Sequence, residues 1–326
     1  MNSTPEDTNV TVPVNQETLA IGISRNVIVV VLGITIKYIN ATMVHTFNSH
    51  HIFKMNPRFI LFIHLVLNDI IQMTTSILLF VVSYVFQTIY VSVCVLLIVP
   101  AILSTLNTPL NLAFMAAECY IAVCIPLRYN YICTVRRTYI VIGVIWATSS
   151  LSVLPDIVIL LATEPLQFLN SRLFCLRDSV FRNPYSLKKR DATHILFLVV
   201  VWITLFYVYF RILFAAKAVK ADSKKARNTI VLHGFQVLLC MMVYVQPMLS
   251  QALTRLFPAG VASVNFALFI INQILPRVIN PIVYGLRDKT FRQCFTRYLC
   301  TMNIYSKRTT NVVFINMQKQ AAVSVV

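Results

Sequence analysis

Long apolar runs separated by short polar segments dominate the chain. A helix rises about 1.5 Å per residue, so about 20 mostly apolar residues are needed to cross a hydrocarbon layer about 30 Å thick. The pattern differs from the short alternating segments of a membrane barrel. It predicts an all-α bundle of seven transmembrane helices. The seven stretches that meet this length are 24–48, 58–84, 94–122, 138–162, 194–217, 228–252 and 262–285.

No charged residue separates the second apolar run from the third: the 48 residues from Ile70 to Ala117 are all uncharged. A single crossing cannot accommodate so many residues. We therefore predict a break between Phe86 and Ser92.

Composition agrees with a membrane protein, since 58% of the 326 residues are hydrophobic and 12% are charged. Soluble domains carry roughly a quarter charged residues, so a soluble enzyme is excluded. With the N-terminus outside, 18 of the 28 cations face the cytosol and eight face outward, which is the expected bias. The net charge of +17 therefore reflects orientation and contact with anionic lipid and a cytosolic partner, with no need for nucleic acid.

This topology divides the chain into three parts: an extracellular N-terminus at 1–23, the bundle at 24–285 and a cytoplasmic segment at 286–326. Asn2 and Asn9 begin glycosylation sequons in the outer segment. Basic and apolar residues alternate from Phe291 to Leu299, which predicts a short amphipathic helix on the membrane after the seventh span.

Two of the eight cysteines, Cys94 and Cys175, fall on the outer, oxidising side. We expect a disulfide between them that ties the long outer loop to the start of the third span. Two unpaired thiols are the alternative, and exposed free thiols are reactive.

Motifs distributed over the chain resemble one family. Residues 115–129 read MAAECYIAVCIPLRY and resemble the M-A-Y-D-R-Y-V-A-I-C-x-P-L-R-Y signature of vertebrate odorant receptors, which are rhodopsin-like G-protein-coupled receptors. Residues 276–289 and 225–233 resemble that family's seventh-span and sixth-span motifs. The sequences around Pro57 and Pro276 are most similar to fish-type receptors. Further span markers are Asn40, Leu65, Asp69, Trp146 and Tyr209.

The resemblance implies a multi-pass plasma-membrane receptor of olfactory neuron cilia. It implies a small odorant as ligand and a heterotrimeric G protein of the olfactory stimulatory type, which raises cAMP. It implies no enzymatic activity, no cofactor and no metal. A non-olfactory rhodopsin-like receptor and a membrane transporter remain alternatives. Ile274 stands where the related opsins have their retinal-binding lysine, so a Schiff base is excluded.

The resemblance also assigns switch residues on the inner side. Glu118, Cys119 and Tyr120 occupy the family's acidic-Arg-Tyr triplet, with the arginine replaced. A thiol cannot supply the donors of a guanidinium. We therefore expect one of two arrangements. Either Glu118 pairs with Arg136, Arg137 or a cation of the third inner loop, or coupling to the G protein runs mainly through those loop cations. The other implied switch positions are Tyr209, His233, Asn280, Pro281 and Tyr284.

Charged residues inside spans are costly and indicate function. Asp69 aligns with the family's sodium-binding aspartate. Arg277 lies three residues before Asn280 and Lys37 three before Asn40, so each pair shares a helix face. Our hypothesis is that Arg277 or Lys37 pairs with Asp69 and takes the place of sodium; a Lys37 that extends to the interface is the alternative.

The outer halves of the third, sixth and seventh spans offer a mostly apolar ligand site with a few polar groups, although simple helix packing is the better explanation for any single residue. No aspartate lies there, which argues against amine ligands. The long outer loop carries a local charge of +3 between Glu164 and Asp191, which predicts either steering of anionic ligands or a solvated face. The expected ligand contacts are Ala101, Ile102, Ser104, Thr105, Tyr244, Met248, Gln251, Phe269, Asn272 and Gln273.

Overall fold

The computed structural model describes residues 16–86, 88–218, 261–279 and 290–298, with positions 235, 245, 249, 250, 252, 253, 255 and 256. In this part of the chain five helices are long and apolar enough to cross a membrane, and a shorter apolar helix spans Phe266–Ile279. The predicted sixth span lies outside the described residues except for single positions. The five long helices are α1 (Gln16–Ser49), α3 (Pro57–Phe86), α4 (Val91–Cys124), α6 (Val135–Thr163) and α9 (Pro184–Ala218).

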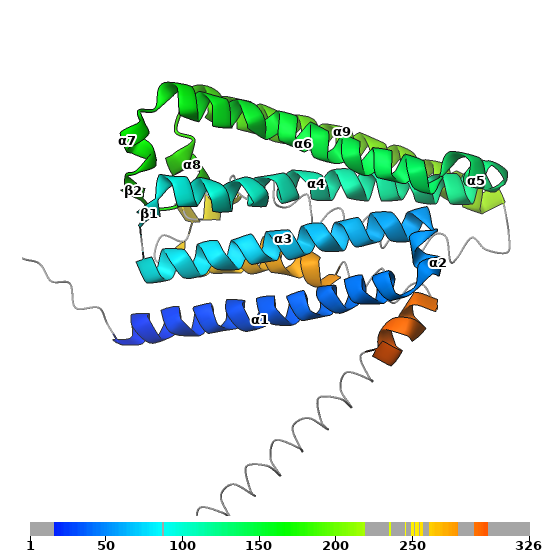
Figure 1. Ribbon diagram of the computed structural model, residues 1–326, viewed down its shortest axis with the longest axis horizontal. Helices are drawn as coiled ribbons and strands as arrows, with labels where there is room; N and C mark the ends of the chain where they lie inside the picture. Colours follow the sequence, from blue (N-terminus) through cyan, green and yellow to red (C-terminus); the bar gives the residue numbers. More distant parts are fainter. Residues whose placement is uncertain are drawn as a thin grey trace, which may run out of the picture.

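The long helices run side by side in a bundle, and α4 packs against α3, α6 and α9 (Figure 1). Short elements gather at the two ends. One end holds β1 (Ile89–Tyr90) paired antiparallel with β2 (Arg172–Leu173), together with α7 (Leu166–Leu169) and α8 (Arg177–Val180). The opposite end holds α2 (His51–Lys54), η1 (Pro126–Arg128) and α5 (Tyr129–Ile132).

Helix boundaries follow local chemistry. The predicted break between the second and third spans is confirmed, because α3 ends at Phe86 and α4 begins at Val91. The Thr134 side chain accepts a hydrogen bond from the Arg137 backbone N–H and caps α6. The helix of the fifth span begins before the predicted apolar stretch at residue 194: α9 starts at Pro184, because its charged first turns stay helical while pairing with neighbouring acids.

The predicted amphipathic helix is present at residues 290–298. Its fully buried Phe291 packs on Phe53, Phe59 and Phe62, with ring centroids 5.2 to 5.7 Å apart. Cys294, Phe295 and Tyr298 are half-buried. The other five residues of the helix, at 290, 292, 293, 296 and 297, are exposed. This spacing of three and four residues is the mark of one apolar helix face.

A directional chain of hydrogen bonds joins α3, α4 and α6. Trp146 Nε1 donates to His64 Nε2 at 2.9 Å, and Asn111 Nδ2 donates to the carbonyl of Leu61 at 3.0 Å. His64 Nδ1 and Asn111 Oδ1 lie 3.3 Å apart. Because Nε2 accepts, the proton of a neutral His64 sits on Nδ1, and every bond in the chain then has a donor and an acceptor.

The seventh span contains an irregularity. The helix α11 (Val261–Phe269) continues into η3 (Ile270–Ile274), which is a π-helix, before α-helical residues resume at 275–279. Asn272, Ile274, Pro276 and Arg277 are all buried, so the extra residue in this turn widens the face that the span presents to the bundle.

Candidate ligand and signalling sites

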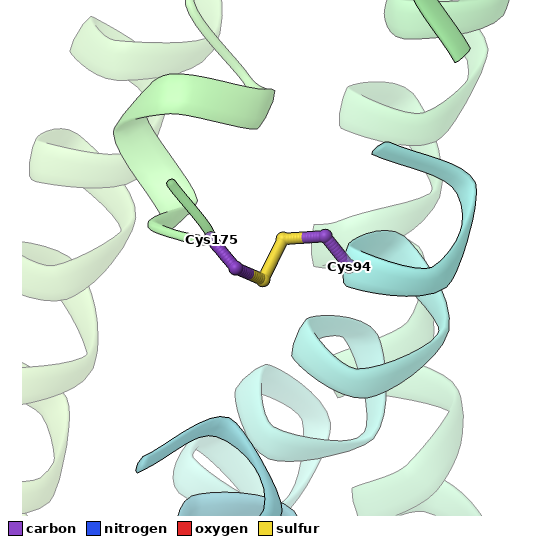
Figure 2. The surroundings of a disulfide bond; sticks show 2 residues. All are labelled: Cys94 and Cys175. Carbon is purple, nitrogen blue, oxygen red and sulfur yellow. A yellow bond between two sulfur atoms is a disulfide. The ribbon is translucent and has the colours of Figure 1, made fainter. Parts of the chain in front are cut away.

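The long outer loop is fastened to the bundle by a disulfide. Cys94 in the first turn of α4 is joined to Cys175, with Cα atoms 5.6 Å apart (Figure 2). Both cysteines are buried. The bond places the loop at the end of the bundle where the expected ligand residues lie, which agrees with the predicted pairing.

Ion pairs also fix this loop. The buried Asp156 of α6 lies 2.6 Å from Lys189 Nζ and 3.6 Å from an Arg177 nitrogen. Glu164 pairs with Arg182, and the hydrogen bond from that guanidinium lowers the pKa of Glu164. Asp178 and Asp191 both pair with Arg190. Four of the loop's six cations are therefore held in place by acids, and steering of anionic ligands by the remaining net positive charge stays a prediction.

The expected ligand residues of the third and seventh spans differ in burial. Ala101, Thr105, Phe269 and Gln273 are half-buried, whereas Ile102, Ser104 and Asn272 are buried. The Ser104 hydroxyl donates to the carbonyl of Pro100 at 2.8 Å, so its donor is already used. Phe269 stacks on Phe80 of α3 at 5.5 Å. Tyr244, Met248 and Gln251 lie outside the described residues.

Gln72 of α3 is the centre of this region and was absent from the expected set. Its Nε2 donates to Thr105 Oγ1 at 2.9 Å and to Gln273 Oε1 at 3.1 Å, so one amide links the second, third and seventh spans. The sequence contains a signal for it: Gln72 is a polar residue inside a span, three positions after Asp69 and thus on the same helix face.

One turn deeper, the core holds a buried ion pair. Arg277 Nε lies 3.6 Å from Asp69 Oδ1, and the two side chains are 2% and 1% exposed. Arg277 Nη1 also donates to the carbonyl of Asn272 at 2.8 Å. Lys37 is half-buried and makes no ion pair with the described residues. Of the two partners considered for Asp69, the structure thus pairs it with Arg277.

Two further amides, in the first and seventh spans, are buried. The side chains of Asn40 and Asn272 are fully buried, and their amide atoms have no hydrogen-bond partner among the residues that the structure describes. Buried polar atoms of this kind are normally hydrogen-bonded.

At the inner end, the triplet is arranged differently from the expectation. Glu118 pairs with Arg58 of α3, at 3.2 Å from Nε, and accepts a hydrogen bond from the Tyr129 hydroxyl at 2.7 Å. The expected pairing with Arg136 or Arg137 is wrong: Arg137 Nη1 instead donates to the carbonyls of Tyr131 and Ile132. The third inner loop, the other source considered, lies outside the described residues from position 219 on. A cavity of about 140 Å³ lies beside Glu118, between α3, α4, α5 and α6.

The structure describes some of the remaining switch residues and not others. Cys119 is buried. Tyr120 lies beside Tyr207, with ring centroids 6.3 Å apart, and its hydroxyl accepts a hydrogen bond from Arg211 at 3.4 Å. The tyrosine of the fifth span beside the triplet is therefore Tyr207, whereas the expected Tyr209 is 36% exposed and contacts Phe210. His233, Asn280, Pro281 and Tyr284, like the sequons at Asn2 and Asn9, lie outside the described residues.

The apolar bundle, the outer disulfide and the polar groups in its interior define a multi-pass α-helical membrane protein. The chain belongs to the rhodopsin family of seven-transmembrane receptors: the family described as 7 transmembrane receptor (rhodopsin family) matches residues 39–284. These are signalling receptors and not enzymes.

Similar proteins are odorant receptors. The chain is 28% identical over 273 residues to odorant receptor 131-2 of Danio rerio, which covers 82% of this chain and 83% of that protein. It is 28% identical over 200 residues to human olfactory receptor 51T1, covering 58% of this chain and 59% of that one. Human olfactory receptor 51Q1 is 26% identical over 208 residues, 59% of this chain and 62% of its own length.

Proposed function

We propose that this receptor binds a small odorant in the outer half of its bundle and activates the olfactory stimulatory G protein, which raises cAMP. Its place is the plasma membrane of olfactory neuron cilia, with the N-terminus outside. The observation that carries the proposal is the similarity to an odorant receptor over 82% of the chain, which is far more than one motif.

The outer half of the bundle supports a small, mostly apolar ligand with one or two polar groups. Gln72, Thr105 and Gln273 form a hydrogen-bonded cluster from three spans. The fully buried Asn272 lies next to Gln273 in sequence and has no side-chain partner among the described residues. A ligand hydroxyl, carbonyl or carboxyl that bonds such an amide satisfies a group whose burial otherwise costs about 1–3 kcal/mol.

The proposal is tested by expressing the receptor in cultured cells with a cAMP reporter and challenging it with acids, amines, alcohols and steroids. We expect at least one class to raise cAMP. Gln72→Leu is expected to weaken that response about tenfold in half-maximal concentration, the factor to which roughly 1.4 kcal/mol corresponds. The matched control is Gln167→Leu, because Gln167 is exposed in α7. A flat response to every class, with the receptor present at the surface, contradicts the proposal.

A further inference from the structure

We propose that Arg58 takes the place of the arginine missing from the Glu118-Cys119-Tyr120 triplet and, with Glu118 and Tyr129, forms a latch that holds the receptor in its inactive state. The regulatory part of this inference rests on the proposed coupling to a G protein. The three residues come from α3, α4 and α5, so the latch ties the inner ends of two spans to the second inner loop.

The sequence places Arg58 firmly. Pro57 occupies the first position of α3, where a missing backbone N–H costs nothing. Asn56 Oδ1 accepts a hydrogen bond from the Arg58 backbone N–H at 3.1 Å, which caps the helix. The guanidinium therefore projects from a defined first turn.

The contact with Glu118 is bidentate. Arg58 Nε donates to Oε2 at 3.2 Å and Nη2 donates to Oε1 at 3.3 Å. Two parallel bonds from a planar fork fix the orientation of both groups, which neither a lysine nor the Cys119 thiol can do. The pair links residues 60 positions apart, whereas the family arrangement joins neighbours in sequence.

Tyr129 supplies the third bond. Its hydroxyl donates to Glu118 Oε1 at 2.7 Å. Burial, followed by the adjacent Glu118 carboxylate, raises the pKa of Tyr129 well above its ordinary value. The hydroxyl therefore keeps its proton and remains a donor throughout the physiological pH range.

Burial makes the latch costly to open. The Glu118 side chain is 7% exposed and that of Arg58 is 34% exposed. Separating them leaves a largely buried carboxylate without its cation, which is the expensive way to disrupt a buried pair. Any rearrangement that separates the inner end of α3 from the inner end of α4 must break this ion pair, so the latch opposes such a rearrangement.

The first experiment measures ligand-free cAMP at equal surface expression. We expect Arg58→Gln to raise it about fivefold, and Tyr129→Phe to raise it about twofold because one hydrogen bond is lost while the ion pair remains. The control is Arg128→Gln, which removes an equal charge from an exposed position of the same inner end and leaves basal cAMP unchanged. No rise with Arg58→Gln, or an equal rise with Arg128→Gln, overturns the latch.

Cys119→Arg provides the sharper comparison, because it restores the family's neighbouring cation. Added to Arg58→Gln, it is expected to return ligand-free cAMP to the wild-type level, since Glu118 regains a partner. A double variant that stays as active as Arg58→Gln overturns the replacement. If Arg58→Gln does not reach the surface, Arg58→Lys keeps the charge but not the fork. A rise above the wild-type level then supports the latch, and no rise overturns it.

A readout without a G protein separates this inference from the proposed function. In purified receptor, Arg58→Gln and Glu118→Gln are expected to lower thermal stability non-additively, because the second change removes an interaction that the first has already broken. Additive losses overturn the pair. If no variant and no ligand raises cAMP while the two changes remain coupled in stability, the proposed coupling fails and the Arg58–Glu118 pair stands.

Discussion

Replacing one member of the Asp69–Arg277 pair should destabilise the bundle far more than replacing both. At 3.6 Å the two charges attract by roughly 5 kcal/mol at an effective dielectric constant of about 20. Their desolvation offsets most of this attraction. Removing one partner leaves the other charge buried, so Asp69→Asn or Arg277→Met is expected to cost about 3–5 kcal/mol, whereas the double variant should lie close to wild type.

The assay is thermal denaturation of purified receptor in detergent, in which each single variant should melt on the order of 10 °C below wild type. Asp178→Asn is the matched control, because Asp178 makes an ion pair from a side chain that is 60% exposed. It should change the midpoint by no more than about 1–2 °C, as surface pairs contribute little. Single variants that melt like this control, or a double variant as unstable as the summed singles, would refute the reasoning.

The same preparation tests whether Arg277 occupies the place of sodium. Exchange of sodium for choline at constant ionic strength should leave the midpoint of wild type unchanged, since the carboxylate already has its cation. Sodium-dependent stabilisation of wild type would show that a second cation still binds Asp69.

Three other changes have defined outcomes. Cys94→Ser should cost about 4.5 kcal/mol by the chain-entropy relation for an 81-residue separation, and reduction of wild type with dithiothreitol should abolish the difference between their melting midpoints. His64→Phe should lower stability by about 1–3 kcal/mol because the indole N–H of Trp146 loses its acceptor, and a normal midpoint in denaturation would contradict that hydrogen-bond chain. Arg182 lowers the pKa of Glu164, so the stability that this ion pair contributes is present at neutral pH and is lost as pH falls through the folded-state pKa. On acidification, hydrogen exchange of the outer loop should therefore rise more in wild type than in Glu164→Gln. A parallel response in both proteins would refute the pair.

The spans were predictable because hydrocarbon imposes a length and an apolar composition that the sequence shows directly. The disulfide was predictable because topology leaves Cys94 and Cys175 as the cysteines of the oxidising side. The start of α9 was not predictable, because an apolar stretch read from hydropathy stops where charged residues begin. In the structure Lys189 and Arg190 are still helical and pair with acids.

The inner partner of Glu118 was not predictable either. Arg58 and Glu118 are 60 residues apart, and their contact depends on how closely the ends of two helices approach, which periodicity does not determine. Gln72 differs, because a polar side chain on the Asp69 face of a span is visible in the sequence; its partners Thr105 and Gln273 depend again on helix packing.

The π-helix at Ile270–Ile274 interrupts the seventh span between Phe269 and Arg277. A π-turn takes in one residue more than an α-turn, whereas in a regular α-helix an added residue turns everything beyond it by about 100°. Deleting one residue within this turn would therefore restore regular α-helix and leave Phe269 close to its present orientation relative to Arg277. The turn is thus a place where the seventh span can gain or lose a residue while the core ion pair and the other side chains of the span keep their directions.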